Sequence, residues 1–286
     1  MEDLRNKYVN MDDNYLEYYQ VSEWSKDNEY IKCYYRKTDQ TWKYYFKSIF
    51  KWHNETMNIW THLLGFLGVF LSNIYINLNY NVNKYISQAI CFNIFTCCMM
   101  ICYLFSSIMH LLYPKSQKVC YHTQFLDYIG INILIASSFA TFVYYAFYCN
   151  KTTQIIYYSV ILTMAIIVLP ISKMKIFLEN KYRWIRPTIF IIYGSSFIAP
   201  IIHKAIINDP DDKIYPLELK YFLISALMYS IGSLLYVTRF PEKCRHGKFD
   251  LIGSSHQLFH ICVLLGGSLS LIGIIKAMSG DNNITC

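Results

Sequence analysis

The stretch SSHQLFHICVLLGG, residues 254–267, places two histidines inside a long apolar run near the C-terminus. His256 and His260 are four residues apart, so on a helix they project from one face, about 6 Å apart along the axis. An ionisable side chain inside a bilayer is costly and marks a functional site when a partner can be named. The stretch therefore predicts a membrane-spanning helix that carries a polar site.

Apolar residues are concentrated in blocks along the whole chain. The chain has 286 residues, of which 54% are hydrophobic and 16% are charged. A helix needs roughly 20 apolar residues to cross a bilayer core. Seven such blocks occur, at about 57–78, 88–112, 125–148, 155–172, 186–207, 217–237 and 251–275. They mostly lack the polar face of helices in a soluble bundle. The sequence thus predicts an all-α, multi-pass membrane protein with a seven-transmembrane helix bundle, in the plasma membrane or an endomembrane.

Basic residues are divided unequally between the two sides of this bundle. Twenty Lys and Arg lie in the N-terminal segment and in the joints after spans two, four and six, against six on the other side. The short joints alone give eleven against six. Because basic loops stay in the cytoplasm, we expect the N-terminus inside and the C-terminus outside. The first 50 residues lack a signal-peptide core, so the first span is expected to direct insertion.

The segment before the first span is amphipathic. In TWKYYFKSIFKWHNET (41–56), aromatic residues recur at helical spacing and Lys43, Lys47 and Lys51 follow at four-residue intervals. Basic amphipathic helices of this kind lie on membrane surfaces. Residues 41–53 are therefore predicted to form an interfacial helix that contacts anionic lipids of the inner leaflet.

The remaining segments complete the predicted domain organisation. Residues 1–40 are polar and without periodicity, which predicts a flexible cytoplasmic segment. The seven-helix domain is expected over 54–276, followed by a short outer tail over 277–286. Five of the ten cysteines lie in spans two and seven, and no Cys-x-x-Cys pair occurs. This distribution favours packing over redox or zinc-thiolate chemistry.

Polar residues of three spans are predicted to meet at one depth near the cytoplasmic end. His256 lies one to two turns inside span seven if that span begins near residue 251. Span two runs in the opposite direction and ends at this depth with His110, one turn after Ser106. Span three begins there, and its first polar residue is Asp127.

This convergence predicts a catalytic zinc site with one Zn²⁺ per chain. Three ligands, His110, His256 and His260, leave one position open for water, whose pKa zinc lowers towards neutrality. Asp127 can accept or orient a proton there, and Ser106 can bond a substrate carbonyl. Two alternatives were weighed. A single intramembrane histidine more often bonds neighbouring helices, and haem would need two axial ligands, which leaves His110 and Asp127 unexplained.

Five motifs resemble those of the progestin and adipoQ receptor family, in which the adiponectin-receptor branch is the most similar and which includes hemolysin III-like proteins. They are NETMNIWTHLLGF (54–66), SSIMH (106–110) with LDYIGI (126–131), RFPEK (239–243), GKFD (247–250) and SHQLFH (255–260). The resemblance covers about residues 45–275. The Ser, Asp and His pattern is also similar to membrane hydrolases that include alkaline ceramidases.

The resemblance implies a seven-helix bundle with its N-terminus inside and a zinc ion held by His110, His256 and His260. It implies a water-orienting or acid/base role for Asp127 and amide hydrolysis of ceramide-like lipids. Glu55 matches a characteristic position whose role it does not specify. Residues 1–40 do not obviously match, so hormone or adaptor binding is not carried over.

Two hypotheses follow from the sequence. The first is a zinc-dependent amidase that converts a ceramide-like lipid to a sphingoid base and a fatty acid. The second is a receptor or sensor in which the zinc is structural and ligand binding shifts helix packing. We expect a membrane-lipid partner and no nucleic acid. The sequence leaves homo-oligomerisation and any protein ligand open.

Overall fold

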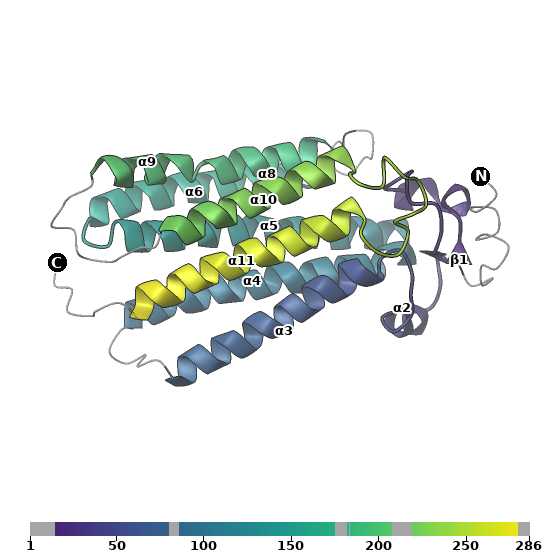
Figure 1. Cartoon of the computed structure of the whole chain (residues 1–286), viewed down its shortest axis with the longest axis horizontal. Helices are drawn as coiled ribbons and strands as arrows, with labels where there is room; N and C mark the ends of the chain where they lie inside the picture. The colour runs from purple at the N-terminus through teal and green to yellow at the C-terminus, as the bar shows by residue number, and fades with distance from the viewer. Residues whose placement is uncertain (1–14, 80–85, 175–181, 183, 208–218, 280–286) are drawn as a thin grey trace.

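Seven long apolar helices dominate the structure, a computed structural model that describes residues 15–79, 86–174, 182, 184–207 and 219–279. Their bounds are α3 (Thr56–Asn79), α4 (Ile86–Leu112), α5 (Gln117–Ala146), α6 (Lys151–Ile171), α8 (Ile185–Ser195) with α9 (Ile198–Ile206), α10 (Leu219–Thr238) and α11 (Ser255–Ser279). The helices run along the long axis of the molecule (Figure 1). The predicted all-α seven-helix bundle is confirmed.

Large apolar side chains cover the outside of the bundle. Leu71 and Leu78 on α3, Ile155 and Leu162 on α6 and Leu234 on α10 are all more than half exposed. Contiguous apolar surface of this extent is rare on soluble proteins. In a bilayer these side chains contact acyl chains at no cost, which explains why the apolar blocks lack polar faces.

Close helix pairs hold the bundle together. The most extensive contacts join α10 to α11, α4 to α5 and α3 to α4. The α4–α5 pair approaches closely at Gly130, where an added Cβ atom would lie 2.8 Å from the Cα atom of Cys102. Between α3 and α4, the Nδ2 atoms of Asn73 and Asn77 donate to Oδ1 of Asn93 at 2.9 and 3.0 Å. Such interhelical hydrogen bonds fix helix register in an apolar surrounding.

Two helices begin at other residues than the sequence predicts. Helix α5 begins at Gln117 rather than near 125, because the Ser116 side chain caps it by accepting a hydrogen bond from the amide of Val119 at 3.3 Å. Helix α11 begins at Ser255 rather than near 251, because its first amide donates to Oε2 of Glu242 at 2.7 Å. His256 is therefore the second residue of α11 and does not lie one or two turns inside it.

The amphipathic segment forms a short helix, α2 (Trp42–Ser48), at the end of the bundle that carries the N-terminal residues. Its aromatic side chains divide between two environments. Trp42, Phe46 and Phe50 are exposed, whereas Tyr45 is fully buried and its hydroxyl donates to the carbonyl of Lys37 at 2.9 Å. The helix thus keeps an outward aromatic face while Tyr45 attaches it to the protein.

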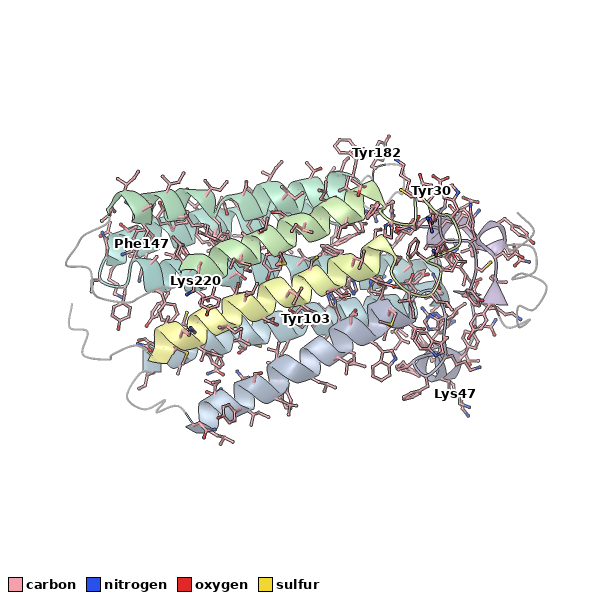
Figure 2. All side chains as sticks on the ribbon, viewed as in Figure 1. Tyr30, Lys47, Tyr103, Phe147, Tyr182 and Lys220 are labelled. Atoms are coloured by element: carbon pink, nitrogen blue, oxygen red, sulfur yellow. The ribbon has the colours of Figure 1, made fainter. Side chains whose placement is uncertain are left out.

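Residues 15–40 form a folded segment, here called the N-terminal cap, which differs from the flexible segment expected over 1–40; residues 1–14 lie outside the described part. Strand β1 (Tyr15–Leu16) pairs antiparallel with β2 (Tyr35–Arg36). The amide of Lys32 donates to Oδ1 of Asp250, and the amide of Gly247 donates to the carbonyl of Tyr30, both at 2.9 Å. Tyr30 and Lys47 mark this end in Figure 2, and Phe147 marks the opposite end. The cap is held in place by contacts with residues that are far away in the sequence. Its polar composition alone did not indicate these contacts.

Cysteines play two structural roles. Those of spans two and seven are free thiols, as the packing interpretation predicts. Cys149, which follows α5 at the end opposite the N-terminal cap, is disulfide-bonded.

A Gly130→Ala substitution should test the close approach of α4 and α5. The new Cβ atom meets backbone, which cannot move aside, so we expect a loss of about 1–3 kcal/mol, typical of overpacking. Thermal unfolding of the detergent-purified protein measures this. Gly68→Ala on α3 is the control, since no atom lies within 4 Å of its added Cβ atom. Equal stability of both variants would contradict the tight α4–α5 packing.

Candidate metal centre

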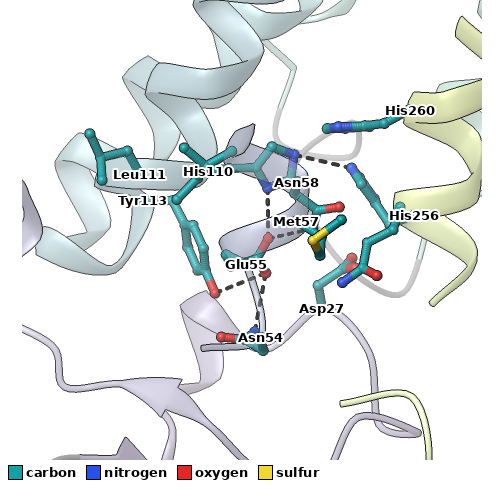
Figure 3. Close-up of polar contacts among 12 residues, drawn as sticks. Asp27, Asn54, Glu55, Met57, Asn58, His110, Leu111, Tyr113, His256 and His260 are labelled. Carbon is teal, nitrogen blue, oxygen red and sulfur yellow. Dashed lines mark hydrogen bonds and ion pairs between the residues drawn. The ribbon is translucent and has the colours of Figure 1, made fainter. Parts of the chain in front are cut away.

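Three histidines meet where α4 ends and α11 begins. His110 lies in the last turn of α4, and His256 and His260 lie in the first two turns of α11. One ligand nitrogen from each falls within 4.8 Å of the other two, and the Nε2 atoms of His110 and His256 are 3.1 Å apart (Figure 3). The histidine convergence predicted from depth and helical spacing is thus present.

The donor set fits a zinc ion. Two Zn–N bonds of about 2.0–2.1 Å at a tetrahedral angle place the nitrogens about 3.3 Å apart. The 3.1 Å separation of His110 and His256 is close to this value, and the ligand nitrogen of His260 lies within 4.8 Å of both. Imidazole nitrogens without thiolates suit zinc and other divalent transition ions rather than magnesium or calcium. The geometry shows that the triad can hold a metal ion and leaves its identity to experiment.

Glu55 orients His110 from the opposite side. Its Oε2 atom lies 2.8 Å from Nδ1 of His110 and accepts a hydrogen bond from Asn58 at 2.6 Å. Its Oε1 atom accepts from Asn54 and Tyr113 at 3.2 and 3.4 Å. Burial alone would raise the pKa of Glu55, but these contacts with His110 and Asn58 outweigh it and lower the pKa to about 2. The carboxylate fixes the proton of His110 on Nδ1 and leaves Nε2 free to ligate.

Thr61 does the same for His260. Its hydroxyl donates to the carbonyl of Met57 at 2.7 Å and lies 3.1 Å from Nδ1 of His260. Since the hydroxyl proton is already used, the oxygen accepts from Nδ1 and directs Nε2 to the centre. His62 packs on the same ring with a centroid separation of 3.7 Å and an interplanar angle of 4°. Both contacts restrict rotation of the His260 ring.

Asp127 on α5 and Ser106, one turn before His110 on α4, line the cavity at the centre. Both are buried, and Asp127 interacts electrostatically with His110 and with the Ser106 side chain. Among the described residues, the possible ligand atoms that lie within 4.8 Å of one another belong to the three histidines. Asp127 is not part of this group. Asp127 is therefore placed beside a ligand rather than among the ligands.

A cavity of about 510 Å³ contacts the three histidines, Glu55, Asp127 and Ser106. It begins at the N-terminal cap, passes the three histidines, Asp127 and Ser106, and continues between α8 and α10. Its walls are predominantly apolar there, with Ile191, Ile198 and Leu223 both lining the cavity and exposed on the outside of the bundle. A chain-like apolar ligand can occupy this space with its polar end near the histidines.

Residues 50–270 match the family described as haemolysin-III related. The chain belongs to this family. The match spans more than half of the chain and includes α4, α5 and most of α11, which carry the centre. Together with the seven apolar helices, membership identifies an integral multi-pass membrane protein.

Three relatives are similar to this chain over most of its length. The adiponectin receptor protein of Drosophila melanogaster is 35% identical over 260 residues, which cover 90% of this chain and 58% of that protein. The progestin and adipoQ receptor-like protein 1 of Caenorhabditis elegans is 32% identical, covering 95% and 62%. Heptahelical transmembrane protein 1 of Arabidopsis thaliana is 34% identical, covering 95% and 83%.

These matches confirm the resemblance predicted from the motifs. The chain spans about three fifths of the length of the two animal relatives. The similarity extends further than predicted, because a match over 95% of the chain necessarily reaches well into residues 1–40.

Sequence reasoning did not identify the roles of Glu55 and Thr61. Glu55 was noted only as a motif position, although it precedes the first span at the depth of His110. That shared depth was the available signal. No sequence signal marked Thr61, because a threonine inside a span commonly forms a hydrogen bond with the backbone of its own helix.

Glu55→Gln should weaken metal binding by about 10–100-fold, the usual cost of losing a ligand's orienting partner. The amide keeps the size but loses the charge that stabilises the Nδ1–H form of His110. Competition with a chromophoric chelator measures the affinity. Glu29→Gln is the matched control, because Glu29 is exposed on the N-terminal cap. Unchanged affinity in Glu55→Gln would show that Glu55 does not support the centre.

Proposed function

We propose that this protein is a zinc-dependent hydrolase that cleaves the amide bond of ceramide-like lipids to a sphingoid base and a fatty acid, with one zinc ion per chain. The observation that carries the proposal is the position of the histidine triad on an apolar cavity inside a membrane bundle. A triad that leaves an open position is the arrangement of catalytic rather than structural zinc sites. The apolar walls select for a lipid.

The chain's own residues supply the remaining chemistry. When bound, the metal supplies Lewis-acid polarisation of the amide carbonyl and activation of a water molecule. Asp127 would take a proton from the attacking water as the new C–O bond forms, and would return that proton to the nitrogen as the C–N bond breaks. Ser106 interacts with Asp127 and can donate to the substrate carbonyl. Glu55 and Thr61 hold two of the ligands in their binding orientation.

The cavity offers the lipid a lateral route. Its lining includes Gly194 on α8 and Ser230 on α10, on the two helices that flank the apolar part of the cavity. Nothing lies within 4 Å of a Cβ atom placed at Gly194. A substrate entering between these helices keeps its chains in the bilayer while its amide approaches the histidines.

We infer that the N-terminal cap lies in the cytoplasm and the C-terminus outside. The excess of basic residues at the cap end supports this orientation. The disulfide at Cys149 supports it as well, because disulfides persist in oxidising compartments and Cys149 lies at the opposite end. The exposed aromatic face of α2, with Lys43 and Lys47 beside it, then lies against anionic lipids of the inner leaflet.

An epitope tag at the C-terminus should be accessible to antibody on intact cells, whereas one at the N-terminus should become accessible only after permeabilisation. The charge distribution and the disulfide both support this expectation. Antibody labelling by flow cytometry measures it, with a cytoplasmic marker as the permeability control. Labelling of the N-terminal tag on intact cells would reverse the orientation.

A second candidate is a receptor in which the metal is structural. The names of two relatives, the adiponectin receptor protein and the progestin and adipoQ receptor-like protein 1, favour it. The two candidates differ in turnover. A receptor keeps its metal and its stability without hydrolysing any lipid amide.

Asp127→Asn should leave metal content near normal and reduce ceramide hydrolysis by about 100-fold or more, since the amide cannot carry the proton. His110→Ala should lose both metal and activity. Metal analysis of the purified protein and release of fatty acid from a fluorescent ceramide measure the two properties. Full activity in Asp127→Asn would assign the proton to another group. A wild-type protein with bound metal and no hydrolysis would favour the receptor.

A further inference from the structure

Asp27 of the N-terminal cap reaches the same cavity as the histidine triad. Residues 24–28 of the cap line this cavity together with His256. The Asp27 side chain is 45% exposed and lines the cavity. Figure 3 shows Asp27 beside His256, although the two residues are 229 positions apart in the sequence. A carboxylate from the cap is thus present next to the candidate metal centre.

Arg239 holds this carboxylate in place. Its Nη2 atom donates to Oδ2 of Asp27 at 2.8 Å and to the Asp27 carbonyl at 3.2 Å. Arg239 is 1% exposed and adopts a φ of 55°, a left-handed conformation that persists only where surrounding contacts enforce it. Burial acts to raise the pKa of Asp27, but the Arg239 guanidinium outweighs it and keeps that pKa below its usual range. Asp27 is therefore ionised, and within the described part of the chain its Oδ1 atom has no hydrogen-bond partner.

His256 lacks the orienting partner that the other two histidines have. Nδ1 of His110 meets Glu55 and Nδ1 of His260 meets Thr61, whereas His256 has no Nδ1 hydrogen bond among the described residues. A metal on Nε2 places the ring proton on Nδ1. His256 is half-buried and lines the cavity, so its Nδ1–H group would take an acceptor there.

Two other carboxylates of this region already accept hydrogen bonds, and Asp127 interacts with His110 and Ser106. Both oxygens of Glu55 accept hydrogen bonds, as described above. Glu242 accepts from Asn28 at 2.9 Å, from the Ser255 amide at 2.7 Å and from the Ser255 hydroxyl. Asp27 has an unoccupied oxygen and interacts electrostatically with His256.

We propose that Asp27 is the positioning residue of His256, which accepts the Nδ1 proton directly or through one water molecule when a metal is bound. The inference rests on the metal centre of the proposed function and adds to it. The N-terminal cap is then part of the centre rather than a cover beside it. Because the same cap residues also attach to Glu242 through Asn28, docking of the cap and metal affinity are coupled.

The test compares Asp27→Asn, Asp27→Glu and Glu23→Gln in the full-length protein purified in detergent. Glu23 is the matched control, since its carboxylate lies on the same cap with 88% of its side chain exposed. Zinc affinity comes from chelator competition, and the Co²⁺-loaded absorption spectrum reports the ligand geometry. We expect about 10–100-fold weaker zinc binding and an altered Co²⁺ spectrum for Asp27→Asn. Asp27→Glu should recover most of the affinity, and Glu23→Gln should match the wild type.

Two results would overturn the inference. One is an Asp27→Asn protein with wild-type affinity and spectrum. If Asp27→Asn does not fold, the spectrum of Asp27→Glu decides, because a longer acceptor must shift the His256 ring and an unchanged spectrum excludes the contact. A wild-type protein that binds neither zinc nor Co²⁺ is a different failure, since it removes the metal centre itself.

Discussion

Each imidazole of the triad must keep one nitrogen free for a metal and bond the other inside a bundle that offers little water. This constraint determines the arrangement of polar groups at the end of the bundle where α4 ends and α11 begins. Glu55 and Thr61 satisfy it for His110 and His260 from the beginning of α3. Arg36 of the N-terminal cap donates to the His110 carbonyl at 2.6 Å and so satisfies the end of α4 as well. The neighbouring loops and the cap are arranged around these polar requirements, because an unpaired polar group there is costly.

The bilayer made much of this architecture predictable. A span has to be apolar for about 20 residues, so the number of spans could be read from composition. A helix crosses the bilayer once, so the position of a residue along its span gives its depth. This reasoning brought His110 of α4, His256 of α11 and Asp127 of α5 to one layer, and the structure has them lining one cavity. Helical spacing alone placed His256 and His260 on one face.

Features outside the apolar blocks escaped prediction because no periodic signal marks them. The start of α11 depends on the Glu242 carboxylate, which meets Ser255 from a loop. The N-terminal cap depends on contacts such as Lys32 with Asp250, which are 218 positions apart. Its polar composition is the same as that of a disordered segment, and only the partner residues distinguish the two. The role of Glu55 could not be predicted for the same reason, because a family motif does not show which side chains a residue contacts.

The contact of Asn28 with Glu242 joins residues 214 positions apart and has a consequence for biosynthesis. Residues 15–40 leave the ribosome first, whereas α11 is inserted last. Until residues 239–250 are made the cap lacks that part of its docking site, and the histidine cluster stays incomplete until α11 is inserted. Nucleation must therefore begin with the local pairs α3–α4 and α4–α5, and closure of the polar end is the final folding step. A nascent chain stalled before its seventh span keeps the contact of His110 with Glu55 but leaves the Nε2 atom of His110 without His256, so an unfinished protein differs chemically from a finished one at this end.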